Sequence, residues 1–279
     1  MIFALNYSPQ AGRLFNEGIL VLDAFKCPDF PDMIARARVH LPVVVHFPIE
    51  VGTGELARGD INLQAIEEMA TDTETRLINC HLVSRRRHHQ KMVGHAPSAA
   101  DTREFIDTAL ADLAVLTGHF GPRRVAVENL IYNGPPKSGV VEDDWLLPGV
   151  QAEVISEVVG SAGVGFLLDL SHARIAAHYA GWDAKTYISS LPVAVLSELH
   201  LTGLGMHNGL LTDHLPLTDD DWAFTQWALD EIKRGHWATP DVIASEYGGE
   251  GPPFSWRTDA SVIADQTPRL FDLAHAACD

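Results

Sequence analysis

Eight short apolar runs recur along the chain, and each is rich in Val, Ile and Leu. Runs of this length without regular polar positions are typical of strands that are buried on both faces of a parallel sheet. The strands predicted in this way span residues 2–6, 19–25, 43–47, 77–82, 125–130, 164–170, 195–201 and 242–247.

Segments of helical character lie between most of these runs. They cover residues 28–39, 62–75, 101–118, 150–159, 218–234 and 261–277. Two of them carry helix-start signals, Asp101 followed by Glu104 and Thr218 followed by Asp221. About eight alternations of strand and helix predict an α/β fold, a closed (β/α)8 TIM barrel rather than an open doubly wound sheet. We expect one domain over residues 1–279.

The composition agrees with one large core, because 46% of the 279 residues are apolar and only 20% are charged. No apolar stretch approaches the roughly 20 residues that cross a bilayer, and the first residues lack a secretory signal pattern. We therefore expect a soluble, cytoplasmic protein without a membrane partner. The three cysteines are scattered, which predicts free thiols.

The charge of the chain argues against nucleic acid as a partner. The formal net charge is −17, whereas nucleic-acid binders usually present a basic face to the phosphate backbone. One basic run, RRRHHQK at residues 85–91, is the exception. It is interpreted first as a solvated loop or helix start, and otherwise as a contact for an anion or a peptide.

Six consecutive predicted strands end in an ionisable side chain. A buried carboxylate or imidazole costs several kcal/mol unless it is paired or bound to a metal. Because a barrel brings the carboxyl ends of its strands to one mouth, divalent cations there would compensate all six. Any one of them alone is more simply a hydrogen-bonded core residue, but jointly they favour a metal site. These candidate ligands are His46, His81, Glu128, Asp169, His200 and Glu246.

Further candidate ligands lie beyond the strand ends. His172 follows Asp169 by three residues, a spacing that can bring both side chains to one metal cluster. His207, Asp213 and His214 lie in the irregular segment 203–216, which follows a strand and should lie at the catalytic face, as should segment 132–145. Asp213 and His214 are weaker as a pair, because adjacent residues of an extended segment point apart.

The ligand set contains imidazole and carboxylate without thiolate, which suits Fe, Mn or Zn. Such a site can activate water, or bind and reduce dioxygen if the metal is iron. Asn6 and Asp23 are interpreted as groups behind the ligands or at the barrel floor. The predicted catalytic residues are Glu128, Asp169 and His172. The predicted substrate-binding residues are Asn129, His207 and Arg85.

The order of the candidate ligands resembles the trinuclear set of endonuclease IV, within the xylose-isomerase-like barrels. The segments that carry this order are VHFP (His46), CHLVS (His81), VEN (Glu128), LDLSHARIAA (Asp169 and His172), ELHL (His200) and Glu246. The stretch LLDLSHARIAAHYAGWDAKTYISSLPVAVLSELHLTG, followed by LLTDHLPLTDDDW, resembles the multinuclear non-heme iron-dependent oxidative (MNIO) enzymes more closely.

The resemblance implies how the ligands would be shared among ions. One ion would take His46, His81 and Glu128. A second would share Glu128 with Asp169, His200 and Glu246. A third would use His172 with Asp213 or His214. The chain departs from the MNIO pattern at His172, where that family usually has asparagine, and at Leu204, where a histidine commonly follows the H-L-x-G motif.

MNIO enzymes use mixed-valent iron and dioxygen to modify residues, often cysteine, of ribosomally made peptides, frequently with a small partner protein that presents the peptide. The resemblance therefore implies two or three Fe ions, with Mn or Zn as alternatives. It also implies an iron-dependent oxidoreductase that acts on a peptide or a small thiol-containing molecule.

Two other enzyme classes stay open at this point. A sugar isomerase or epimerase with one or two divalent metals would need only Glu128, Asp169, His200 and Glu246, and it leaves the remaining histidines unexplained. An endonuclease IV-like phosphodiesterase has the right ligand order, but a net charge of −17 is unfavourable for binding a duplex. A non-catalytic binding module fits the polar strand ends least.

Overall fold

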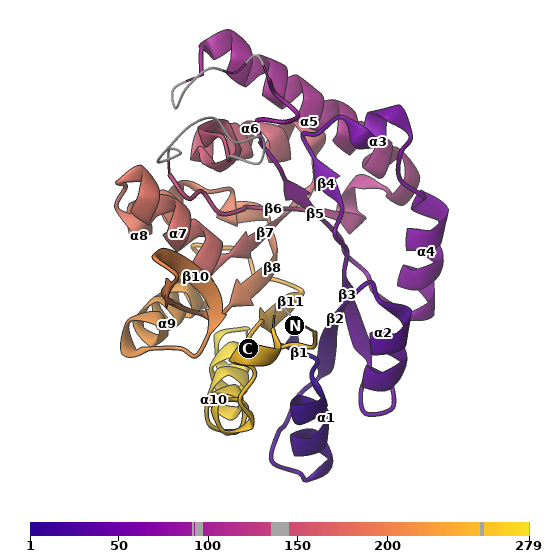
Figure 1. Cartoon of the computed structure of the whole chain (residues 1–279), viewed down its shortest axis with the longest axis vertical. Helices are drawn as coiled ribbons and strands as arrows, with labels where there is room; N and C mark the ends of the chain where they lie inside the picture. Colours follow the sequence, from indigo (N-terminus) through magenta and orange to yellow (C-terminus); the bar gives the residue numbers. More distant parts are fainter. Residues whose placement is uncertain (91, 93–96, 135–144, 252–253, 279) are drawn as a thin grey trace. The chain divides into compact units, whose positions relative to one another are not determined.

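Strands and helices alternate along most of the chain in the computed structural model (Figure 1). The structure describes residues 1–90, 92, 97–134, 145–251 and 254–278. The chain divides into two compact units. Unit 1 comprises Met1–Phe47, Met69–Thr75 and Leu196–Asp279, and unit 2 comprises Pro48–Glu68 and Arg76–Val195. The single domain expected over residues 1–279 stays a prediction.

The sheet of unit 1 contains parallel strands in the order β3-β2-β1-β11-β8. They are β1 (Ile2–Asn6), β2 (Ala24–Pro28), β3 (Val43–His46), β8 (Leu196–Leu201) and β11 (Val242–Ser245). The small side chains of Ala4, Ala24 and Ala244 pack against one another in the core of this sheet. The register sets Ala244 of β11 level with His200 of β8, so the residues just after β11 lie close to that imidazole.

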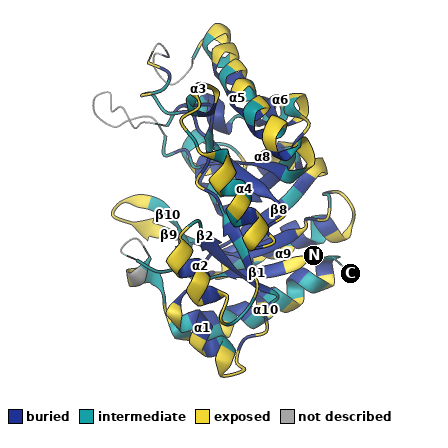
Figure 2. Ribbon diagram, turned by 90° about the vertical axis from the view of Figure 1, so that its right-hand side faces the viewer, coloured by how far each residue is buried: buried dark blue, intermediate teal, exposed yellow. Residues whose placement is uncertain are grey.

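Helices cover the sheet of unit 1. They are α1 (Pro9–Asn16), α2 (Pro31–Ala37), α9 (Asp219–Lys233) and α10 (Ala260–Cys278), with a short 3-10 turn, η4 (Ser255–Arg257). Figure 2 shows the strands of this sheet as mostly buried, whereas α1 and α2 mix buried and exposed positions, as expected for helices with one face on a core.

A β-hairpin follows β8 directly. Its strands, β9 (Gly203–His207) and β10 (Leu210–Leu215), pair in antiparallel fashion, so the expectation of an irregular segment over 203–216 is wrong. Asn208 and Gly209 join the strands with φ of 50° and 77°. A two-residue turn with positive φ at both positions matches the right-handed twist of the flanking strands, and Asn-Gly is its commonest sequence.

Unit 2 contains a second set of parallel strands, in the order β7-β6-β5-β4. They are β4 (Glu50–Val51), β5 (Ile78–Leu82), β6 (Val125–Glu128) and β7 (Gly165–Asp169). Its helices and 3-10 turns are α3 (Glu55–Arg58), α5 (Ala99–Phe120), η1 (Pro122–Arg124), η2 (Leu147–Val150), α6 (Ala152–Ala162), α7 (Leu170–Ala180), α8 (Ala184–Ser190) and η3 (Val193–Val195). Helix α4 (Leu63–Asp72) contributes residues to both units.

The second predicted strand, 19–25, is misplaced, because β2 runs from Ala24 to Pro28. Ile19 and Val21 are 45% and 60% exposed, so the apolar run that suggested the strand lies largely at the surface. Lys26 lies beyond the predicted strand, yet it is buried within β2 because a carboxylate accepts its charge. The other predicted strands lie within two residues of the observed bounds.

The predicted helix-start signals are confirmed in part. Thr218 caps α9 in a reciprocal capping box with Asp221, as expected. The cap of α5 is Ser98, and Asp101 is its partner three residues on rather than the first residue of the helix.

Other expectations concern the cysteines, the membrane and the second loop. Cys27 and Cys80 are free thiols, as predicted. Among the described residues, no helix has both the length and the apolar character needed to cross a bilayer. Within the predicted loop 132–145, residues 135–144 lie outside the described part of the chain.

Candidate metal centre

Glu128 is the central residue of a buried polar group in unit 2. It ends β6 and is level with His81 of β5, because the two strands are in parallel register there. Its Oε2 lies 3.2 Å from Nε2 of His81, and its Oε1 lies 3.4 Å from Nδ1 of His172. Glu128 is 1% exposed, so two partly buried imidazoles meet one buried carboxylate.

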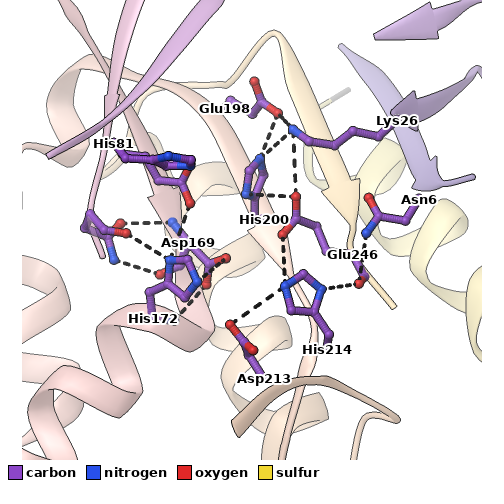
Figure 3. A network of polar contacts seen from close by, with 12 residues as sticks. Asn6, Lys26, His81, Asp169, His172, Glu198, His200, Asp213, His214 and Glu246 are labelled. Atoms are coloured by element: carbon purple, nitrogen blue, oxygen red, sulfur yellow. Dashed lines mark hydrogen bonds and ion pairs between the residues drawn. The ribbon is translucent and has the colours of Figure 1, made fainter. Parts of the chain in front are cut away.

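Asp169 and His172 are brought together by the start of a helix. Asp169 ends β7 and caps α7, with Oδ1 accepting a hydrogen bond of 2.7 Å from the His172 amide. A cap residue and the third residue of the helix lie on the same side of the first turn. Oδ2 of Asp169 therefore lies 3.7 Å from Nε2 of His172 (Figure 3). The two side chains lie close together where the chain enters a helix rather than a loop, and the binding of both to one metal cluster stays a prediction.

The tautomer of His172 favours Nε2 as a ligand. Its Nδ1 lies 3.0 Å from the carbonyl oxygen of Asn129, and a carbonyl can only accept, so Nδ1 carries the proton. The lone pair of Nε2 then faces Asp169. One donor atom from each of Glu128, Asp169 and His172 lies within 4.8 Å of the others, a spacing that suits one ion.

Asn129 holds Asp169 in place. Its amide group donates to the Asp169 carbonyl at 3.0 Å and accepts from the Asp169 amide at 2.9 Å. The side chain is fully buried between β6 and the end of β7. Its predicted role in substrate binding stays a prediction, and its contacts are those of a residue that positions Asp169.

Two substitutions of Asp169 separate its helix cap from its charge. Asp169→Asn keeps a good cap, whereas Asp169→Ala loses it at a cost of about 0.5–2 kcal/mol. Both remove an anionic donor, and we expect both to weaken metal binding by more than about 10-fold. Thermal unfolding of the metal-free protein and metal content after reconstitution check this. An Asp169→Asn protein that retains metal as the wild type does would contradict the role as ligand.

Unit 1 contains a second group of possible ligands. His46 ends β3, His200 lies in β8 and Glu246 follows β11. Nδ1 of His200 lies 3.3 Å from Oε1 of Glu246, and the rings of His46 and His200 are 5.5 Å apart. One donor atom from each of the three lies within 4.8 Å of the others. His200 is fully buried, and Glu246 is 7% exposed.

Sequence reasoning missed two charged residues beside His200. Lys26 of β2 and Glu198 of β8 are buried and form an ion pair. Burial raises the pKa of the Glu198 carboxyl, but the Lys26 ammonium and the contact with His200 outweigh it and lower the pKa to about 2. Glu198 could have been found, because it lies two residues before His200 and strand alternation puts both on one face.

The predicted pair Asp213 and His214 lies near Glu246. His214 has a φ of 55°, and the ladder of the hairpin shifts register between Thr212 and Leu215. The two side chains therefore do not point apart: Nε2 of His214 lies 3.8 Å from Oδ2 of Asp213. His214 donates from Nδ1 to the Glu246 carbonyl at 2.6 Å, so its Nε2 lone pair faces the carboxylates of Asp213 and Glu246.

The two groups fit the metals that the sequence suggests. Each offers imidazole nitrogen and carboxylate oxygen, the donor types that Fe, Mn and Zn accept. The structure groups His172 with Glu128 and Asp169, and it groups His46 with His200 and Glu246. The assignment of the ligands to two or three ions, including a shared ion for His46 and His81, stays a prediction because it combines residues of both units.

The remaining predicted residues lie around these groups. Asn6 donates to the Glu246 carbonyl at 3.1 Å, which agrees with a place behind a ligand. Asp23 accepts from the Phe3 amide near the opposite end of β1, as a barrel-floor residue would. His207 stacks on Trp256 with ring centroids 4.4 Å apart.

Part of the basic run after β5 is built into unit 2. The Arg85 guanidinium lies 4.3 Å from the centre of the Trp145 ring. His89 is 8% exposed, and its Nε2 donates to the Gly52 carbonyl at 2.7 Å. The interpretation of this run as a solvated segment is therefore wrong for His89.

The stability of the protein should depend on His89 as the pH falls. Burial lowers the pKa of His89 below its ordinary value, and the Gly52 contact only partly opposes this. The unfolded chain then binds the proton first, so stability is complete above about pH 6.5 and is lost as the pH falls. A His89→Gln variant keeps a donor for Gly52. Urea denaturation at about pH 7 and at about pH 5 measures how much stability each protein loses between the two pH values. The variant should lose less than the wild type, and an equal loss would contradict this.

The chain resembles known proteins over most of its sequence. A sequence profile described as "RiPP precursor modification enzyme MbnB/TglH/ChrH" matches residues 27–238. A UPF0276 protein of Rhizorhabdus wittichii is 25% identical over 204 residues, which are 72% of this chain and 69% of that protein. A UPF0276 protein of Chromobacterium violaceum is 26% identical over 205 residues, 72% of this chain and 70% of that protein.

Solved structures resemble the chain over nearly its whole length. A xylose isomerase domain containing protein of Salmonella typhimurium LT2 has a TM-score of 0.58 and 13% identity, covering 98% of this chain and 97% of that one. A D-allulose 3-epimerase of Methylomonas sp. has a TM-score of 0.55 and 10% identity, covering 98% of each chain. These likenesses confirm the predicted fold class, the xylose-isomerase-like TIM barrel.

Proposed function

This chain belongs to the MbnB/TglH/ChrH family of enzymes that modify the precursors of RiPPs, ribosomally made and post-translationally modified peptides, and we propose that it is an iron-dependent oxidative enzyme. Its substrate is a peptide or a small thiol-containing molecule, and its oxidant is dioxygen. A small partner protein that presents the peptide is part of the proposal.

One observation carries this proposal. Each unit contains its own buried group of imidazole and carboxylate donors, and the two groups share no residue. Glu128, Asp169 and His172 can hold one ion in unit 2, while His46, His200 and Glu246 can hold another in unit 1. A capacity for more than one ion supports a multinuclear enzyme over a chain that binds a single ion.

The side chains of this chain have separable tasks in the proposed reaction. Iron bound at the two groups would supply the redox chemistry that couples dioxygen to oxidation of the substrate. Asn129 fixes the backbone of Asp169, and the Asn129 carbonyl fixes the tautomer of His172. The burial of Glu128 and Asp169 excludes water from the charged donors, which strengthens their hold on a cation.

The test begins with protein purified without oxygen and reconstituted with Fe²⁺. We expect at least two iron ions per chain by elemental analysis. Free cysteine, glutathione and a panel of short cysteine-containing peptides are then supplied with air. We expect oxygen uptake with at least one of them, together with a change in its mass. The same assay on chelator-treated protein is the control and should show neither.

Full turnover by iron-free protein would overturn the proposal. One metal ion per chain, combined with epimerisation of a ketose such as D-allulose, would favour a sugar epimerase instead. The fold likeness to a D-allulose 3-epimerase makes this the second assay to run. The fold does not decide between the two activities, because xylose-isomerase-like barrels host several chemistries.

A further inference from the structure

A buried ion pair lies directly behind one of the proposed ligands. Lys26 and Glu198 are each 2% exposed, and the ammonium of Lys26 contacts Oε1 of Glu198. The same oxygen lies 2.8 Å from Nε2 of His200, and Figure 3 marks this contact with a dashed line. All three residues belong to parallel strands of unit 1, Lys26 to β2 and the other two to β8. None of the roles proposed so far uses Lys26 or Glu198.

The contact with Glu198 selects one tautomer of His200. A carboxylate only accepts hydrogen bonds, so a bond between Glu198 and Nε2 requires the proton on Nε2. Nδ1 then carries the lone pair and lies 3.3 Å from Oε1 of Glu246. Two acceptor atoms so close together repel each other unless a cation lies near both. The arrangement therefore makes Nδ1 the metal-binding nitrogen.

Lys26 has a second contact that could favour the other tautomer. Its Nζ lies 2.7 Å from Nε2 of His200, and an ammonium can donate to an unprotonated nitrogen. The bond from Lys26 to Glu198 is stronger than the bond from Lys26 to His200, because both partners of the first bond are charged. Lys26 thus serves mainly to hold the Glu198 carboxylate charged and in place, 2.8 Å from the His200 nitrogen.

We propose that Glu198, held by Lys26, is a positioning residue that keeps the proton of His200 on Nε2 and turns Nδ1 toward the bound ion. The inference rests on the proposed metal centre of unit 1. Carboxylates behind metal-binding histidines orient the ring and raise its basicity, and their loss weakens metal binding by about 10- to 100-fold.

A purely structural ion pair makes a different prediction. Replacing both charges of a buried pair by apolar side chains of similar size is often neutral for stability, whereas removing one is costly. If the pair served stability alone, an apolar double substitution would restore everything that single substitutions lose. If Glu198 positions His200, the double substitution restores folding but leaves metal binding weak.

The experiment compares single and double variants in anaerobic Fe²⁺ titrations with a competing chelator. The variants are Lys26→Met, Glu198→Leu, Lys26→Met with Glu198→Leu, and Lys26→Met with Glu198→Gln. We expect the Met/Leu double variant to unfold near the wild-type temperature and to bind one iron about 10- to 100-fold more weakly. The Met/Gln variant keeps an acceptor for Nε2, so it should regain part of that affinity.

Two further measurements separate positioning from general damage. Leu229 is a buried residue of α9 in unit 1, so Leu229→Ala destabilises the core without removing a charged group, and the iron affinity of this variant should stay at the wild-type value. Nitrogen-15 spectra of the His200 side chain, recorded with diamagnetic Zn²⁺, should show a proton on Nε2 in the wild type. The same spectra of the Met/Leu variant should lose this preference.

Wild-type iron affinity in the Met/Leu variant, or Zn²⁺ bound through Nε2 in the wild type, would overturn the inference. In either case the proposed oxidative function could still hold, because the metal would still bind. A different result would refute the function and leave the role of Glu198 intact. In that case the wild type binds two irons but oxidises no thiol or peptide, and the Met/Leu variant loses one of the two irons. A wild type that binds neither Fe²⁺ nor Zn²⁺ would refute both.

Discussion

A Glu128→Ala variant is expected to lose iron from unit 2 and to lose turnover by at least about 100-fold. Groups behind a ligand already contribute about 10- to 100-fold to metal affinity, and a carboxylate that contacts two imidazoles directly should contribute more. The substitution also leaves His81 and His172 facing a vacated, buried position. Iron content and the rate of oxygen uptake measure the two effects separately.

Glu157→Ala is the matched control for this variant. Glu157 is an exposed residue of α6 that pairs with Arg103 at the surface, so its loss should leave iron content and turnover unchanged. Exposed ion pairs contribute about 1 kcal/mol or less. A Glu128→Ala protein that keeps both of its irons and its activity would remove Glu128 from the metal centre, and with it the proposed grouping in unit 2.

A Lys26→Met variant is expected to lose about 3–5 kcal/mol of folding stability when no metal is bound. The substitution keeps the volume of the side chain but leaves the Glu198 carboxylate buried with no cation at contact distance. A loss of this size is a large part of the stability of a typical protein. Denaturation in urea with a chelator present measures it.

Arg38→Met provides the comparison for this loss. Arg38 forms an exposed ion pair with Asp72 in the same unit, and breaking it should cost about 1 kcal/mol or less. Adding Glu198→Leu to Lys26→Met should recover most of the lost stability, because no lone charge is then buried. Equal losses for Lys26→Met and Arg38→Met would mean that the Lys26 ammonium is not needed to compensate Glu198.

The strand ends were the part of the site most open to prediction from sequence. His200, Glu128 and Asp169 each close an apolar run, and a parallel sheet brings the carboxyl ends of its strands to one edge. The position of such residues follows from strand direction alone. A strand-end residue could therefore be predicted as a candidate ligand without knowing the structure of any loop.

Charges inside a strand were harder to predict. Lys26 and Glu198 interrupt apolar runs, and a single charged residue there looks like the end of a strand or a solvated position. Their burial depends on each other, and they lie 172 positions apart in the sequence. Strand alternation relates Glu198 to His200, but no local pattern pairs Glu198 with Lys26, which the misplaced second strand left outside β2.

The hairpin was missed for a different reason. Asn208 and Gly209 are a strong two-residue turn signal, but the residues around them alternate weakly between apolar and polar. The positive φ of His214 then reverses the direction of a side chain that an extended segment would turn away. A local backbone conformation that few non-glycine residues adopt thus determines the direction of the His214 side chain.

The two oxygens of Asp169 limit what evolution can place at this position. One oxygen holds the first turn of α7, and the other faces His172 across 3.7 Å. A glutamate carries the same charge on a longer stem, so its oxygens could not reach both partners from the same backbone position. Side-chain length is therefore under selection here in addition to charge, and homologous chains should keep aspartate in preference to glutamate.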